Sequence, residues 1–285
     1  MTPKNSYVTL TDFKNYRVAR QQSTSVTADT TDDGVIEQLL EAASRFIDSK
    51  TGRWFYPRIE TRSYTLPDYL GEFYSKELYF DADVLEIVTF LNGDGASIAA
   101  TQYNLLPKNE HPKFMMKMKA TSSVVWALDS DGEWEYVLDL TAVFGYHNKY
   151  VNAWKVGTTL SEALDTTETE FDVTSAALFA SGQIIKIDSE INIVSTAPTG
   201  KINVVSRGDN GSTAATHDSG ATVYIWQPME DVRNAVCEIA NTAYGRRFGR
   251  SASNTETITA AGIVLSPRDI PAMATEFISV YRRYV

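Results

Sequence analysis

Few residues in this chain have the types and spacing that catalysis requires. The sequence contains no G-x-S-x-G, H-E-x-x-H, P-loop or G-x-G-x-x-G pattern, which mark hydrolases, zinc proteases and nucleotide sites. Its three histidines, His111, His147 and His217, are far apart in sequence. The single cysteine, Cys237, excludes an internal disulfide and a cysteine-based zinc site. It lies beside the apolar face of a predicted helix, where cysteine typically acts as a small buried hydrophobe. We therefore expect no catalytic, cofactor-binding or metal-binding residues.

Two short acidic motifs could still carry chemistry. Asp188 and Glu190 are two residues apart, so their side chains share one face of a strand, and paired carboxylates are the catalytic groups of glycoside hydrolases. The stretch 129–133 (DSDGE) resembles a calcium loop but lacks the third acidic ligand and the distant glutamate. A solvated face and a hairpin turn are the commoner explanations. The RGD tripeptide at 207–209 matches a cell-adhesion signal, but chance explains it better in a glycine-rich turn.

Aromatic residues beside arginines are the stronger candidates for function, because Trp, Tyr and Arg dominate protein–protein hot spots. The residues 54–56 (WFY) lie between Arg53 and Arg58, and we expect at least one of them in a core. A second group lies near the C-terminus, at predicted helix ends. The sequence predicts a partner-binding surface there, made of Arg246, Arg247, Arg250, Tyr281, Arg282, Arg283 and Tyr284. Ordinary helix ends, with arginines complementing the helix dipole, are the alternative.

These candidates must be positioned by helices from both chain ends. The clearest helix spans 33–51, where apolar residues recur with a 3.6-residue period and Gly52 follows as a C′ glycine. Further helices are expected at 229–244, ended by Gly245, and at about 267–284, capped by Ser266 or Asp269. A short helix should begin near residues 10–13, with Thr11 or Asp12 as its cap. The polar stretches 21–31 and 250–265 are predicted loops.

Strand patterns fill the middle of the chain. Runs rich in aromatic and β-branched residues occur at 62–66, 76–80, 85–91, 113–119, 124–128 and 134–146, with hairpin signals at 92–95 and 129–132. These predict an antiparallel β-domain of about five to seven strands. Shorter alternating runs between 155 and 227, separated by glycines, predict a second β-module of barrel or sandwich type.

The predicted fold class is α+β. A small helical bundle from both chain ends (1–53 and 229–285) accompanies an antiparallel β-domain at 54–154. The β-module at 155–228 is expected as an insertion, because its removal would join a strand directly to the next helix.

Charge argues against several classes of function. The 285 residues carry a net charge of −10, so binding of nucleic acid by bulk attraction to a basic surface is not expected. No run of residues has the length of about 20 apolar positions that spans a bilayer. Residues 229–285, with seven basic and six acidic groups, form the only segment that is not acidic.

The two chain ends carry a family resemblance. The stretch from Asp33 to Ser44, continued by Phe46-Ile47-Asp48 and by residues 51–55 (TGRWF), resembles the head–tail connector (adaptor) proteins of tailed bacteriophages. A leading Y-x-T-L-x-D segment, here residues 7–12, is also similar to that family, as is Ile270-Pro271 before a last helix that ends in YRR. The resemblance covers about 1–56 and 229–285. The enlarged middle departs from the family's usual compact size.

The resemblance implies a non-enzymatic structural protein of the virion neck, assembled in the host cytoplasm. Such connectors form a ring, usually of twelve copies, between the portal protein and the stopper or tail protein. Double-stranded DNA passes through the channel without specific binding, and no membrane is involved. The alternative is a phage sugar- or receptor-binding protein that uses the β-module, with Tyr224 and Trp226 as its candidate aromatics. A hydrolase using Asp188 and Glu190 is a third, weaker hypothesis.

Overall fold

The computed structural model describes residues 4–21, 30–67, 75–248, 257–258, 264–265 and 270–283. The chain divides into two compact units. The first comprises Met1–Arg53, Lys155–Asp209 and Thr213–Val285, and the second comprises Trp54–Trp154 and Asn210–Ser212. The segment 155–228 therefore falls mainly in the same unit as the helices. Helices from both chain ends pack together and both large sheets are antiparallel, so the predicted α+β class is confirmed.

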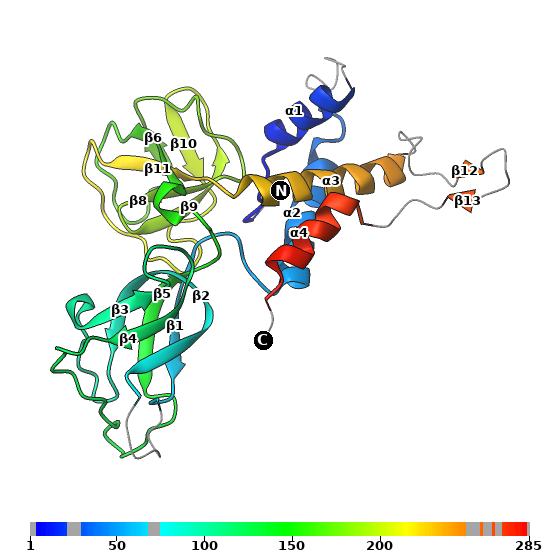
Figure 1. Cartoon of the computed structure of the whole chain (residues 1–285). Helices are drawn as coiled ribbons and strands as arrows, with labels where there is room; N and C mark the ends of the chain where they lie inside the picture. Colours follow the sequence, from blue (N-terminus) through cyan, green and yellow to red (C-terminus); the bar gives the residue numbers. More distant parts are fainter. Residues whose placement is uncertain are drawn as a thin grey trace. The chain divides into compact units, whose positions relative to one another are not determined.

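The helices of the first unit are α1 (Leu10–Gln21), α2 (Asp33–Thr51), α3 (Glu230–Phe248) and α4 (Ala272–Tyr281) (Figure 1). Helices α2 and α3 each contact the other three, so this pair forms the centre of the bundle. The buried apolar residues of α2, Ile36, Leu40, Ala43 and Ile47, belong to the predicted stripe. The other three residues predicted for that stripe, Val35, Leu39 and Phe46, are only half-buried. Gly52 follows in the left-handed conformation, with φ 67°, and donates its N–H to the Asp48 carbonyl. None of the described helices combines the length and the apolar character needed to cross a membrane.

Several predicted helix ends are wrong. Helix α1 begins at Leu10 because the hydroxyl of Thr9, and not Thr11 or Asp12, accepts the Asp12 N–H at 3.1 Å. Helix α3 continues through Gly245 to Phe248. Tyr244 anchors that last turn: it donates a hydrogen bond to the Asp32 carboxylate at 2.6 Å and lies under the Arg17 guanidinium.

The last helix is shorter than predicted. Pro271 occupies the N-cap position of α4, while the expected caps Ser266 and Asp269 lie outside the described residues. The helix ends at Tyr281 and Arg282 is extended, because the Arg283 N–H donates to the Thr51 carbonyl of α2. Part of the predicted loop at 250–265 is a two-stranded hairpin, with β12 (Thr257–Ile258) paired to β13 (Val264–Leu265). The residues 22–29 of the other predicted loop are not described.

The β-module of the first unit is one six-stranded sheet in its described residues and not a closed barrel. A bridge between Leu160 and Val173 joins the residues that follow its two edge strands, β6 and β7. The strand order is β6-β11-β8-β9-β10-β7. The bounds are β6 (Trp154–Thr159), β7 (Glu170–Asp172), β8 (Ile184–Ile187), β9 (Glu190–Thr196), β10 (Lys201–Val204) and β11 (Thr222–Trp226). Its core is mainly aliphatic and includes Phe171, Ile185 and Val223, each with no exposed surface.

The second unit is a five-stranded antiparallel sheet in the order β1-β5-β2-β4-β3. The bounds are β1 (Arg58–Tyr64), β2 (Glu77–Leu91), β3 (Tyr103–Leu106), β4 (Lys113–Met118) and β5 (Leu138–Phe144). Its core includes the buried Leu138, Leu140 and Phe144 of β5. Phe55 is also buried, as expected for one residue of 54–56, whereas the ring of Trp54 stacks under the Arg58 guanidinium at 3.3 Å.

The structure corrects the strand predictions in three places. The segments 76–80 and 85–91 belong to one long strand, β2, in which Asp81 accepts hydrogen bonds from Tyr64 and Arg62 and is thereby satisfied in mid-strand. The segment 124–128 is not a strand, because the Asn92 side chain bonds the Val125 carbonyl and the Ala127 N–H in place of a ladder. Strand β3 was not predicted.

We predict that Leu40→Asp unfolds the first unit, whereas Leu39→Asp does not. Leu40 has no exposed surface, so the substitution buries an unpaired charge and costs about 4 kcal/mol or more. Leu39 is only half-buried, and its substitution should cost about 1 kcal/mol. Thermal unfolding followed by circular dichroism measures both variants. Equal losses would contradict the central position of Leu40.

Candidate partner-binding surface

The structure describes three residues of the predicted C-terminal cluster, Tyr281, Arg282 and Arg283. Arg282 is exposed, whereas Arg283 and Tyr281 are half-buried. The Tyr281 carbonyl accepts a bond from Arg53 Nε at 2.8 Å, and its hydroxyl donates to Asp231 at 3.0 Å. The side chain of Tyr281 and the main chain of Arg283, whose N–H donates to the Thr51 carbonyl, therefore fasten the end of α4 to the bundle.

The other predicted residues of this surface cannot be placed in the same way. Arg246 and Arg247 belong to the last turn of α3, and their side chains lie outside the described part of the structure, as do Arg250 and Tyr284. Among the described residues, only Tyr281, Arg282 and Arg283 are brought together. Of the seven predicted residues, Arg282 is the exposed one among the three whose side chains the structure describes.

A groove between α3 and α4 was not predicted from the sequence. It has a volume of about 250 Å³, and its walls are apolar at Ala235, Met273, Phe277 and Val280 and polar at Asp231, Asn234, Glu276 and Tyr281. Phe277 is buried and stacks on Tyr281 with ring centroids 4.5 Å apart. Met273 and Val280 leave 56% and 67% of their surface exposed. Helix α4 thus carries apolar residues on its outer face as well as its inner face, as helices that a partner covers do.

The sequence contained a signal for this groove. The ten residues of α4, AMATEFISVY, include a single charged side chain, Glu276. The exposed polar side chains of α4 are Thr275, Glu276 and Ser279, and the apolar Met273 and Val280 are exposed as well. Helical spacing from Ile270 predicts Met273 on the buried stripe, but the structure places it outside because Ala274 and Phe277 make the contact with the bundle.

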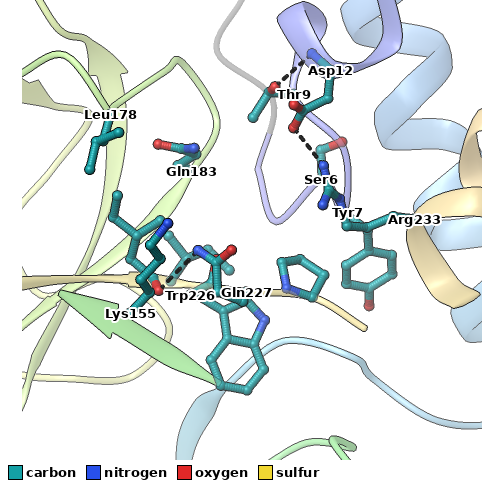
Figure 2. Close-up of a pocket in the computed structure, with 13 residues that line it drawn as sticks. Ser6, Tyr7, Thr9, Asp12, Lys155, Leu178, Gln183, Trp226, Gln227 and Arg233 are labelled. Carbon is teal, nitrogen blue, oxygen red and sulfur yellow. Dashed lines mark hydrogen bonds and ion pairs between the residues drawn. The ribbon is translucent and has the colours of Figure 1, made fainter. Parts of the chain in front are cut away.

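A second cavity of the first unit, of about 270 Å³, includes Trp226, a candidate aromatic of the sugar-binding alternative, but no residue of the predicted partner-binding surface. Figure 2 shows its lining by Ser6, Thr9 and Asp12 from the N-terminal segment and by Lys155, Gln183 and Gln227 from the β-module. Asp12 is ion-paired with Arg233 at 3.0 Å. The charges of those two lining residues are therefore already compensated within the protein.

The acidic pair at 188 and 190 has a structural environment. Glu190 has no exposed surface and forms two hydrogen bonds with the Arg207 guanidinium, at 2.7 and 2.8 Å. His217 lies between the carboxylates, with Nε2 2.8 Å from Glu190 and Nδ1 2.8 Å from Asp188. The Glu190 carboxylate also accepts the Gly208 and Ala215 N–H groups. This network closes the loop that follows β10.

This environment argues against the hydrolase and adhesion hypotheses. Burial alone would raise the pKa of Glu190, but the bonds from Arg207, Ala215 and His217 outweigh it and lower that pKa to about 2. A carboxyl with that pKa holds no proton to donate at neutral pH. Arg207 of the RGD tripeptide turns inward to Glu190, and the Asp209 carboxylate accepts the Ile193 N–H, so neither is presented to a receptor.

The remaining candidates for chemistry are also buried. Trp226 is 3% exposed, and the Tyr224 ring is half-buried with the Lys186 ammonium 5.9 Å from its centre, so these two do not form an exposed sugar-binding platform. Cys237 is buried, as expected, and burial raises the pKa of its thiol to about 12. In the described ranges, no three His, Cys, Asp or Glu side chains are grouped so as to hold a metal ion.

No model of a known protein family, no curated protein and no solved structure matches this chain. The function of the protein is therefore inferred from the residues and surfaces described above.

We predict that acid unfolding of the β-module depends on Glu190. Because the pKa of Glu190 is lowered in the folded protein, its contribution is present above the unfolded pKa near 4.5 and is lost as pH falls towards 2. That contribution is about 3 kcal/mol. Glu190→Gln should destabilise the protein at pH 7, since it leaves Arg207 buried and unpaired, and should flatten the stability curve between about pH 5 and 2.

Asp188→Asn is the matched control, because the Asp188 carboxylate is 67% exposed. Chemical denaturation at several pH values measures each variant. An unchanged acid limb in Glu190→Gln would contradict the assignment.

Proposed function

We propose that this protein is a structural component of a tailed-phage virion, a head–tail connector that forms a ring between the portal and the tail or stopper protein. The proposal is carried by one observation: the two segments that resemble the connector family are the segments that form the helical bundle. The segments that resemble the connector family, 1–56 and 229–285, supply α1, α2, α3 and α4, which pack on one another. Two segments almost 180 residues apart thus act as one structural element, as a shared core requires.

The outer face of α4 supports docking to a partner protein. Met273, Val280 and Arg282 are exposed on this helix and at its end. Apolar side chains flanked by an arginine are the composition of interface anchors. We propose that the portal covers this face. The hypothesis modifies the sequence-based one, because Tyr281 and Arg283 serve the bundle and Arg282 is left for the partner.

The net charge is compatible with a DNA channel. Twelve copies at −10 each would carry a charge of about −120, and an acidic lumen repels the DNA backbone so that the duplex slides through without sticking. In the second unit, acidic side chains add to this charge: Asp129, Asp131 and Glu133 in one turn, and the exposed Asp81. Many acidic proteins line no channel, so the charge supports the proposal without carrying it.

The test of this proposal is particle assembly. Purified protein mixed with portal rings should form a ring beneath the portal, visible by negative-stain microscopy, and phage lacking the gene should accumulate tailless heads. A protein that remains monomeric with the portal, together with normal tail attachment in the deletion, would reject the connector function.

We predict that Val280→Glu combined with Arg282→Glu leaves the protein folded and weakens portal binding at least about tenfold. Both side chains are exposed, so the unfolding temperature should not change. The two new carboxylates should weaken binding, because the proposed portal surface accepts an apolar and a basic side chain at these positions. Lys50→Glu, at an exposed position of α2, is the control in the same bundle. Pull-down with portal rings and plaque complementation measure the effect; normal binding by the double variant would remove α4 from the interface.

A further inference from the structure

Positive charge gathers on one hairpin of the second unit, although the chain as a whole is acidic. Residues 103–119, which comprise β3, β4, their connection and the residue after β4, contain four lysines and a single acidic residue, Glu110. The strands are paired in register from Tyr103 opposite Met118 to Leu106 opposite Met115. The charge is therefore carried by a well-defined element of the sheet.

A cleft of about 490 Å³ opens beside this hairpin. Its charged and polar lining consists of Glu86, Asn104, Lys108, His111, Lys113 and Lys119. Its apolar lining includes Leu85, Ile87 and Leu105. Three lysines thus face one glutamate, and that carboxylate already accepts a hydrogen bond from the Tyr150 hydroxyl at 2.9 Å.

Lys113 builds the wall of the cleft. Its buried ammonium donates to the carbonyls of Pro107, Lys108 and Glu110 at 2.7, 3.1 and 2.6 Å. These three bonds use all of its donors and fix the connection between β3 and β4. Carbonyls leave the positive charge of the ammonium in place, and burial lowers the pKa of Lys113 while Glu110 opposes that effect. Lys113 therefore contributes positive electrostatic potential to the cleft, but no hydrogen bond to a ligand.

Two other lysines have donors available for a ligand. The ammonium of Lys108 is exposed and makes neither a hydrogen bond nor an ion pair in the described part of the chain. Lys119 donates one hydrogen bond, to the Thr101 carbonyl at 2.7 Å, and keeps two N–H groups. Burial and the charge of Lys113 lower the pKa of His111, so its neutral ring can offer one further N–H at pH 7.

We propose that this cleft binds a phosphate ester, with the phosphate between Lys108 and Lys119 and the organic group against Leu85, Ile87 and Leu105. The volume lies within the range of about 300–1,000 Å³ that is typical of small-molecule sites, and it exceeds what a bare oxyanion needs. Two sources share this chemistry: a free nucleotide, and one nucleotide of a DNA strand. The inference goes beyond the connector function and does not depend on it.

Calorimetric titration at low salt tests the site with thymidine monophosphate, thymidine and a thymidine oligonucleotide. The monophosphate should bind at least about tenfold more tightly than thymidine, because the lysines recognise the phosphate. Lys108→Glu combined with Lys119→Glu should weaken that binding at least about tenfold. The matched control is Lys117→Glu on β4, whose ammonium pairs with Glu77 and does not line the cleft; it should change the affinity less than about twofold.

The same titrations separate the two sources. Tighter binding of the oligonucleotide than of the monophosphate, lost in the double variant, identifies a DNA strand as the ligand; equal or weaker binding identifies a free nucleotide. Absence of binding by the unmodified protein overturns the proposal, and so does an equal loss in Lys117→Glu, which would show unspecific attraction. Thermal melting checks folding, and Lys108→Glu alone, at an exposed position without partners, provides the test if the double variant unfolds.

Discussion

The burial of one face of α2 is the constraint on which the helical unit depends. Ile36, Leu40 and Ile47 lose nearly all contact with water, and α1 alone is too short to cover them. The covering helices α3 and α4 come from the other end of the chain. The fold therefore requires the chain to return after almost 180 residues, and the entropy of closing so long a loop grows only slowly with its length. Large β-structures can consequently be accommodated between α2 and α3.

Polar groups fix the ends of this bundle where apolar packing cannot. The Tyr7 hydroxyl donates to Asp48 at 2.6 Å, and Arg53 and Thr51 bind the main chain of residues 281–283. Each of these contacts joins α2 or its exit to a segment distant in sequence. Buried polar groups are costly when unpaired, so they specify one arrangement of the helices among the many that would bury the same apolar area.

The sequence predicts those elements that are fixed by interactions between neighbouring residues, and it does not predict those fixed by residues far apart in the sequence. The α2 helix was predicted from residue 33 to residue 51 because its stripe and its C′ glycine are local signals. The end of α3 was not, because Tyr244 is held by Asp32 and Arg17, more than 200 residues earlier. The same reason explains segment 124–128, whose β-branched run is held by Asn92 instead of a strand. The candidate surface changed too, since helix exposure depends on what α4 packs against, which residues 270–283 alone do not determine.

Arginine and lysine side chains are of two kinds in this chain: buried ones that are paired within the fold, and exposed ones that a partner or a ligand can reach. Arg207 and Lys113 are buried, and their donors are taken by Glu190 and by main-chain carbonyls. Each holds a loop, so its charge stabilises the fold at that place. Arg282 and Lys108 are exposed, so their charged groups are accessible to a partner or a ligand. Sequence composition gives all four the same weight. Their burial and partners distinguish them, and this argues that the function of the chain resides at the few positions where its acidic, polar surface is interrupted.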